Sequence, residues 1–486
     1  MTNPAASRPV PRAVGPLLLA ALAVIYGWAH FHYPLYPGQG AAEGRPGWWS
    51  WSDQFEYWKS AAAMAGGRLA ADSCHYPPGY AALGALCWRL MPADPFFVPN
   101  LALVLLAAAA WWRLAVSLLD WRRAVAVGAV FVATHATLLG HTMVVPWNTI
   151  PTQAALLAGM VLVLDEARPR QVLWLAVLAA VTYWTRPGDA LAFGPLLVLA
   201  VARLRVGRDR LRAGLGASLI LVAAYLMQGW FNLRVFGAWR SPYEALSVER
   251  IGFLGYPFSY KLHWLLVDGR PLFGETAPAL LFRYPWLCLA VPGAVHWLGR
   301  KGAAAAAGLL AMATSWLLYV NYNDFLPSDI YRFNLIHYLA WTFPVLFLLA
   351  AAAVLHGWRE RPTRIGFGVA AGLVLLASGL QLDEAPLPAE RETGWNLPPH
   401  RPLLVHFAGE PAAAVTRLRL DGRPLAEYAD YLTALEPADL RLLLGRRAGG
   451  MRLSTEPPGS LGGPPQLSTL KWGWRLEGGR LAGVGR

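Results

Sequence analysis

Apolar segments of helix-spanning length recur along most of the chain, separated by short polar loops. Segments near the ~20 residues that a bilayer core requires lie at 13–33, 98–119, 123–143, 147–165, 170–186, 187–204, 211–232, 277–298, 303–320, 333–356 and 364–381. A further apolar stretch, residues 77–91, is short, opens with two prolines and a glycine, and contains Arg89. The pattern predicts an all-α polytopic membrane protein with about eleven transmembrane helices.

Composition supports this class and narrows the partners. The chain is 56% hydrophobic and only 15% charged, far more apolar than an ordinary soluble protein. Its net charge of +13 comes from Lys and Arg in short loops, with no basic helix or stripe, so no nucleic-acid partner is expected. The cysteines, Cys74, Cys87 and Cys288, have neither disulfide-framework nor zinc-ligand spacing.

The distribution of basic residues predicts which loops face the cytoplasm. Arginine and lysine concentrate in the loops 120–123, 165–171, 203–212, 300–301 and 357–364, whereas the alternate loops 144–151, 185–190 and 321–332 hold none or one. This alternation of basic and non-basic loops places the N-terminus inside and the C-terminus outside if residues 77–91 form a helix on the outer face. The high Ala, Gly, Arg and Pro content suggests a bacterium, and hence its cytoplasmic (inner) membrane.

The chain is expected to form two domains. A transmembrane domain, residues 1–381, carries a large first external loop with surface helices, 34–97, and a second external loop, 233–276. After residue 381 the sequence becomes polar and rich in Pro and Gly, and LLVHFA, TRLRLDG and GWRLEGGRLAGV read as short strands. Residues 382–486 are therefore predicted to form a small β-rich or α+β extracytoplasmic domain.

Asp53 is the leading candidate for a catalytic group. It lies in the first external loop within WWSWSDQFEYW, where aromatic rings favour a raised pKa and contact with sugar faces. An ordinary structural interpretation is that Asp53 caps the following helix, with Glu56 three residues on as in a capping box. The two interpretations are compatible, and Glu56 stays an alternative base because it shares nearly the same helix face.

The first external loop resembles that of a known enzyme superfamily. Asp53, Tyr57, Trp58 and Ala61, then a Gly66-Gly67 turn, then the YPPGY stretch from Tyr76 to Tyr80, are similar to the GT-C membrane glycosyltransferases. The likeness is greatest to the protein-mannosyltransferase and aminoarabinose-transferase branch (glycosyltransferase family 39 and its bacterial relatives). TRPG at 185–188 and IYRFNLIHYLAWTFP resemble further family elements, and the resemblance covers most of residues 1–381 but not the tail.

The resemblance implies a polyprenyl-phosphate sugar donor, a glycan, lipid or protein acceptor at the outer membrane face, and Asp53 as the catalytic residue. Arginine or lysine at the membrane boundary would bind the phosphate that remains on the lipid and balance its charge. Ordinary alternatives are interfacial snorkelling, or a salt bridge between Arg186 and Asp189. The candidate substrate-binding residues are Glu56, Tyr57, His75, Tyr76, Asn148, Arg186, Asp189, Lys261, Arg332 and His337.

One position departs from the family pattern. Many members carry a second acidic residue in the next external loop, whereas this loop reads VVPWNTIP and offers Asn148. An amide can bond a sugar hydroxyl but is a poor sole anchor for a divalent metal ion, so no metal ligands are assigned, and a divalent metal ion stays an open alternative.

Other functions of lipid-linked sugars compete with the transferase. A transporter or flippase needs polar groups deep within several spans, and a polymerase or ligase is expected to carry its decisive residues in a long late loop. The polar groups here gather at the outer ends of the spans and in the first loop. The sequence therefore favours an inverting or retaining glycosyltransferase.

Overall fold

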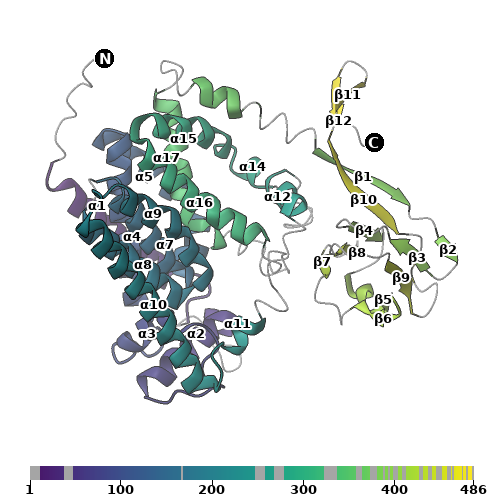
Figure 1. The fold of residues 1–486 in the computed structure, drawn as a ribbon, viewed down its shortest axis with the longest axis horizontal. Coiled ribbons are helices and arrows are strands. Elements are labelled where there is room, and N and C mark those ends of the chain that lie inside the picture. The colour runs from purple at the N-terminus through teal and green to yellow at the C-terminus, as the bar shows by residue number, and fades with distance from the viewer. Residues whose placement is uncertain are drawn as a thin grey trace. The chain divides into compact units, whose positions relative to one another are not determined.

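The computed structural model is mostly helical, with antiparallel sheets after residue 380 (Figure 1). It describes residues 11–37, 47–165, 168–246, 258–267, 279–321, 337–356, 364–370, 372, 380–386, 389–391, 394–397, 403–407, 412–425, 431–435, 440–444, 451–456, 461, 465–472, 474–477 and 480–483. Two compact units are formed. The first comprises Met1–Glu244, Pro292–Trp316 and Ile336–Gly366, and the second comprises Ala245–Val291, Leu317–Leu335 and Phe367–Arg486.

Within the described part of the chain, four helices are long and apolar enough to cross a bilayer. They are α1 (Val14–Phe31), α4 (Phe97–Leu118), α10 (Arg208–Phe236) and α16 (Ala303–Asn321). A fifth candidate consists of α5 (Trp121–Thr134), α6 (Ala136–Leu139) and the π-helical η2 (Gly140–Val144), with a bend of 77° after α5. Exposed apolar side chains on α1, such as Val24 at 73%, suit contact with lipid and confirm a membrane protein.

Shorter apolar helices occupy most of the other predicted spans. They are α7 (Thr149–Leu162), α8 (Pro169–Thr185), η3 (Pro187–Ala192) with α9 (Phe193–Ala202), α15 (Leu287–Lys301), and η7 (Ala340–Thr342) with α17 (Phe343–His356). The last predicted span, 364–381, ends too late, because strand β1 already begins at Leu380. Polar backbone groups at that point pair with a neighbouring strand, and the chain there is no longer helical.

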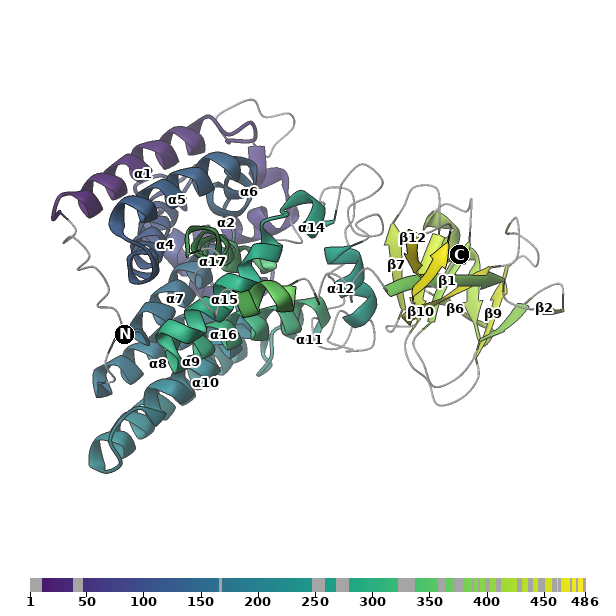
Figure 2. The ribbon, with the colours of Figure 1, turned by 90° about the horizontal axis from the view of Figure 1, so that it is seen from above.

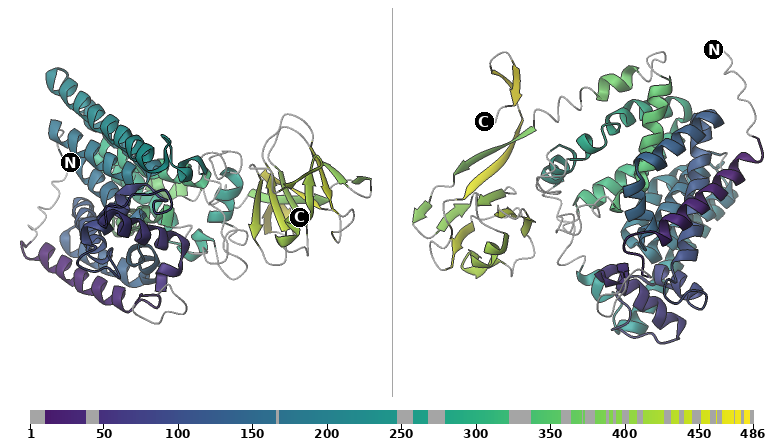
Figure 3. Two further views of the ribbon diagram at one scale, coloured as in Figure 1. Left: turned by 90° about the horizontal axis from the view of Figure 1, so that it is seen from below. Right: turned by 180° about the vertical axis from the view of Figure 1, so that it is seen from behind.

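In the first unit α8 packs against α7, α9 and α10, and α4 packs against α1 and α7 (Figure 2). The end of this unit that carries the first loop holds η1 (Gly47–Ser50), α2 (Ser52–Ala65) and α3 (Pro78–Cys87), visible in purple and blue in both views of Figure 3. Ten residues are too few to cross a bilayer, so α3 is not a span by itself. That residues 77–91 lie on the outer face stays a prediction.

The first loop is fastened to α1 and to the turn before α4. His30, at the end of α1, lies 2.5 Å from Asp94 through Nε2 and Oδ2, with exposures of 0% and 1%. Two indole groups donate to the same turn, Trp49 to the Ala93 carbonyl at 2.8 Å and Trp58 to the Pro92 carbonyl at 3.1 Å. These bonds hold the loop in one position over the helices.

Arginines on either side of the connection between α9 and α10 (Arg208–Phe236) close the ends of neighbouring helices. Arg203 donates from Nη1 to the carbonyl of Val163 at 2.7 Å, and Val163 is the residue that follows α7. Arg210 donates from Nη2 to the Ala202 carbonyl at 2.6 Å, and from Nε to the Leu204 carbonyl at 3.1 Å. Carbonyl groups at helix C-termini lack helical partners, and here guanidinium groups supply them.

The second unit contains the end of α11 (Pro242–Leu246), α12 (Phe258–Leu266), α14 (Leu280–Arg283) and the sheets. One sheet has the order β1-β10-β4-β8-β7, another β2-β3-β9-β5-β6, and β11 pairs with β12, all antiparallel. The remaining bounds are β1 (Leu380–Pro386), β2 (Ala389–Arg391), β3 (Gly394–Leu397), β4 (Leu403–Phe407), η9 (Ala412–Arg417), β5 (Leu418–Leu420), β6 (Arg423–Pro424), β7 (Tyr431–Leu435), β8 (Leu440–Leu444), β9 (Met451–Thr455), β10 (Gln466–Trp472), β11 (Trp474–Glu477) and β12 (Arg480–Gly483).

The three sequence segments expected to form strands do so. LLVHFA supplies β4, TRLRLDG supplies β5, and GWRLEGGRLAGV supplies the hairpin of β11 and β12. Alternating side chains of β4, Val405 and Phe407, join Leu418 and Leu453 in a buried core, which is what one covered sheet face requires. The β-rich character of the tail is thereby confirmed.

Candidate active site

Asp53 lies in the first turn of α2, two positions further into the helix than the cap residue. The residue that caps α2 is Trp51, whose backbone is extended and whose side chain makes no capping bond. The predicted capping role of Asp53 is therefore wrong: Ser52 already belongs to the helix. The carboxylate still lies at the N-terminal end of the helix dipole, where negative charge is favoured.

The Asp53 side chain is held by the turn that precedes α3. The Tyr76 hydroxyl donates to Oδ1 of Asp53 at 2.6 Å, a bond between segments 23 residues apart. Tyr76 directly precedes Pro77 and Pro78, and Pro78 begins α3. Since the proline rings fix their own φ and restrict the preceding residue, the hydroxyl is held in place for this bond.

Gly79 seats this turn against the end of α8. A Cβ at Gly79 would meet the Trp184 carbonyl oxygen at 2.7 Å and Cγ2 of Thr185 at 2.9 Å, so only glycine allows the approach. Arg186 follows directly, with an extended backbone that ends α8. The close contact of two prolyl turns, YPPG and TRPG, thus brings the first loop next to Arg186.

Arg186 and Asp189 form a buried ion pair. Nε of Arg186 lies 3.2 Å from Oδ2 of Asp189, and the side chains are 8% and 2% exposed. The guanidinium group also lies over the ring of Tyr338, 4.6 Å from its centroid. Nδ2 of Asn148 donates to the Thr185 carbonyl at 3.4 Å, which places the amide beside the same turn. The predicted salt bridge is confirmed, and it fixes the guanidinium group in one orientation.

Burial raises the pKa of Asp53, and the environment partly offsets this effect. The hydrogen bond from Tyr76 and the charges of His75 and Arg186 lower the pKa, whereas Glu56 raises it. Burial also raises the pKa of Tyr76 far above its ordinary value, so this hydroxyl keeps its proton and stays a donor. A carboxylate with a raised pKa close to a fixed guanidinium group is suited to take a proton while anionic charge is held nearby.

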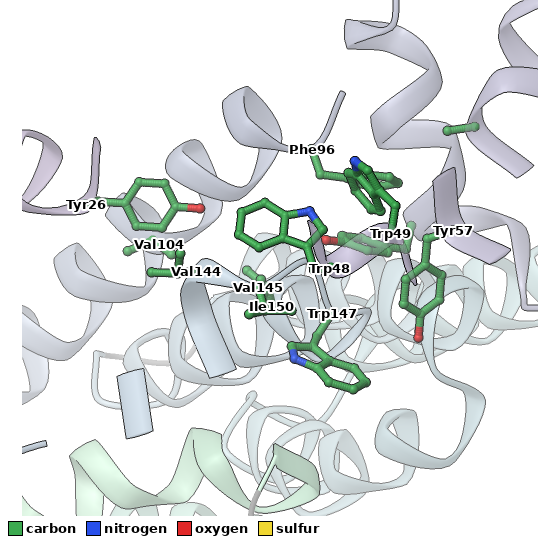
Figure 4. Packing of buried hydrophobic residues seen from close by; sticks show 12 residues of the cluster. Tyr26, Trp48, Trp49, Tyr57, Phe96, Val104, Val144, Val145, Trp147 and Ile150 are labelled. Carbon is green, nitrogen blue, oxygen red and sulfur yellow. The ribbon is translucent and has the colours of Figure 1, made fainter. Parts of the chain in front are cut away.

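Aromatic rings surround the carboxylate. The Tyr76 ring lies 4.9 Å from that of Tyr57 and 4.7 Å from that of Tyr243, and the His75 ring lies 5.3 Å from that of Tyr243. Tyr57 belongs to a buried cluster with Trp48, Trp49 and Trp147 (Figure 4). Gln54, next to Asp53, donates to the Pro146 carbonyl at 3.1 Å and thereby ties α2 to the turn before α7.

The remaining predicted residues separate into three groups. Glu56 is paired with Lys59 at 2.8 Å, so it is a less available base than Asp53. His337 is buried and stacks on Trp147 with ring centroids 4.7 Å apart, near the same end of α7. Lys261 belongs to α12 of the second unit, and Arg332 lies outside the described residues.

Tyr243 was missed by the sequence reasoning. The SPYE sequence carried a local signal, because Ser and Glu three residues apart are typical of a capping box and a helix start. That signal predicts α11 (Pro242–Leu246) but not its contact with the first loop, which depends on tertiary packing.

A divalent metal ion does not fit the described residues of this region. No group of three or more His, Cys, Asp or Glu side chains among them is arranged to hold one. Of the predicted residues with oxygen ligands, Glu56 pairs with Lys59, and the Asn148 amide nitrogen donates to a backbone carbonyl.

Comparison of the chain with protein-family models, with curated proteins and with solved structures gave no match in any of the three.

Proposed function

We propose that the protein is a membrane glycosyltransferase that moves a sugar from a polyprenyl-phosphate donor to a glycan, lipid or protein acceptor at the outer membrane face. The observation that carries the proposal is the carboxylate of Asp53, held by Tyr76 in a largely aromatic setting and within electrostatic range of Arg186. The resemblance of the first loop to GT-C enzymes supports the same activity.

In the proposed transfer, one residue accepts a proton from the acceptor and another stabilises the charge of the leaving phosphate. Asp53 accepts the proton of the acceptor hydroxyl as its oxygen bonds to the anomeric carbon, and the bond from that carbon to the phosphate oxygen breaks. The lipid phosphate leaves with the bonding electrons, and Arg186 balances its negative charge. Tyr76 keeps the carboxylate oriented, and Asp189 keeps the guanidinium group oriented.

The proposed topology places these groups at the outer face. Eleven crossings, with the N-terminus inside and the C-terminus outside, put the YPPG and TRPG turns together at the outer end of α8. A bacterial cytoplasmic membrane supplies polyprenyl-phosphate donors there. The β-rich tail, residues 382–486, then lies outside the cytoplasm on the same side as the proposed site.

Transport of lipid-linked sugars is a weaker candidate. Buried polar side chains do occur on α7 at Thr149, Thr152 and Gln153. They lie within five residues of Asn148, which at 1.5 Å per residue is about 7 Å along the helix axis. A path across the bilayer needs polar groups through ~30 Å of hydrocarbon, so the polar residues of α7 do not by themselves form a path.

The decisive experiment replaces Asp53 by Asn in purified protein and supplies radiolabelled polyprenyl-phosphate sugars. We expect transfer and release of lipid phosphate to fall by about a hundredfold or more, because a general base contributes about 10²–10⁴-fold. The matched control is Asp72→Asn, an exposed carboxylate of the same loop that accepts from Ser73. Equal activity of Asp53→Asn and wild type, in folded protein, would refute the proposed role of Asp53.

A further inference from the structure

The loop after α10 begins with a short helix held by side-chain bonds. Oε2 of Glu244 accepts from the backbone N–H of Ser241 and from Nδ2 of Asn232, each at 3.0 Å. The Ser241 hydroxyl accepts in turn from the Glu244 N–H at 3.1 Å. Asn232 also donates to the Trp239 carbonyl at 3.0 Å, so the start of α11 is tied to the last turns of α10.

This network fixes the position of Tyr243, which lies between the bonded residues Ser241 and Glu244. The Tyr243 ring lies 4.7 Å from that of Tyr76 at an interplanar angle of 67°, and 5.3 Å from that of His75 at 61°. Tyr76 is the residue whose hydroxyl holds Asp53. Two loops that are far apart in the sequence thereby meet at the catalytic carboxylate.

We infer that Tyr243, together with His75 and Tyr76, forms a subsite that binds the apolar C–H face of a pyranose ring next to Asp53. The inference rests on the proposed function for the identity of the transferred group, and it adds Tyr243 as a substrate-positioning residue. Tyr243 contributes an aromatic face from the second loop, and the Ser241, Glu244 and Asn232 network positions it.

The chemistry of the three rings favours a sugar. Aromatic ring faces carry negative quadrupole potential, which attracts the slightly positive C–H groups of a pyranose ring. Tyrosine hydroxyls and the His75 nitrogens can bond sugar hydroxyls at the rim. Half-buried exposure of His75, Tyr76 and Tyr243 matches a subsite that is partly open before a ligand binds.

The test measures sugar binding directly, so that it does not depend on transfer. Methyl pyranosides serve as probes in saturation-transfer NMR, with the protein in a detergent that has no sugar headgroup. We expect Tyr243→Ala to weaken pyranoside binding by about tenfold, because the loss of one stacking ring raises the Kd by about that factor. Tyr243→Phe keeps the ring and should retain binding. Tyr243→Leu keeps an apolar side chain without the ring and should resemble Tyr243→Ala.

Two further variants separate positioning from a general loss of structure. Glu244→Ala should weaken binding through Tyr243, so that its effect and that of Tyr243→Ala are not additive. Tyr284→Ala is the control, a tyrosine of the second unit whose ring lies 6.0 Å from that of Trp286. It should leave pyranoside binding unchanged.

The outcomes distinguish this inference from the proposed function. Weaker binding in Tyr243→Ala and Tyr243→Leu, with Tyr243→Phe unchanged, supports the subsite even if no sugar transfer is detected from any lipid donor. Absence of pyranoside binding by wild type, or equal binding by Tyr243→Leu and wild type, overturns the subsite even if transfer is measured and depends on Asp53.

Discussion

Replacement of Gly79 by Ala tests whether the contact between the YPPG and TRPG turns positions Tyr76, the residue that holds Asp53. The new Cβ would lie 2.7 Å from the Trp184 carbonyl oxygen, whereas ordinary contact begins near 3.4 Å. The turn must therefore move by about 0.7 Å, and overpacking of this kind typically costs about 1–3 kcal/mol. Tyr76 is three residues away, and its bond to Asp53, at 2.6 Å, has little tolerance for such a shift.

We expect Gly79→Ala to lower the apparent melting temperature in detergent and to reduce transfer by about a hundredfold, since a displacement near 1 Å can have that effect. Gly214→Ala in α10 is the matched control, because its Cβ would meet no atom within 4 Å. It should not lower the melting temperature. A Gly79→Ala protein with the stability and transfer rate of wild type would show that the two turns do not depend on this close contact.

Three predictions concern the protonation of Asp53 and the burial of charged groups. Tyr76→Phe removes a bond that lowers the pKa of Asp53, so the acidic limb of the pH–rate profile should move to higher pH, and an unmoved limb would argue against Asp53 as the base. Because burial raises this pKa in the folded state, the contribution of Asp53 to stability is present at low pH and is lost as pH rises through the folded pKa. Asp53→Asn should therefore raise thermal stability near pH 7 relative to wild type, and an equal or lower melting temperature there would contradict this reasoning. Asp94→Ala leaves His30 buried without its partner and should cost about 3–5 kcal/mol, measured by denaturant or thermal unfolding. The double variant His30→Ala/Asp94→Ala should lose less than the sum of the two single changes, and strict additivity would contradict the pairing.

Local features of this protein could be predicted from the sequence, and contacts between distant segments could not. Hydrophobic segments predict the helices, and alternating residues predict β4 and β5, because both depend on nearby positions. The Arg186–Asp189 pair, three residues apart, follows from local spacing. The bond between Tyr76 and Asp53 required the packing of α2 against α3, and the capping role assigned to Asp53 was wrong by a shift in the helix start.

Tyr243 illustrates the same limit at greater separation. Its capping box is legible in the sequence, but the ring reaches Tyr76 only because Glu244 and Asn232 tie α11 to α10 and α10 packs along α8. Neither hydrophobic periodicity nor charge distribution along the sequence carries information about these tertiary contacts.

The arginines that donate to carbonyls at the ends of α7 and α9 have a consequence for the evolution of the proposed membrane topology. In that proposal Arg203 and Arg210 belong to a basic cytoplasmic segment, residues 203–212, and both also donate to backbone carbonyls. Replacement of either by Lys preserves the charge that directs insertion but removes the planar fork that makes the helix-closing bonds. Such a chain would insert in the same orientation with less firmly closed helices, so selection on orientation and selection on helix closure act separately on one side chain.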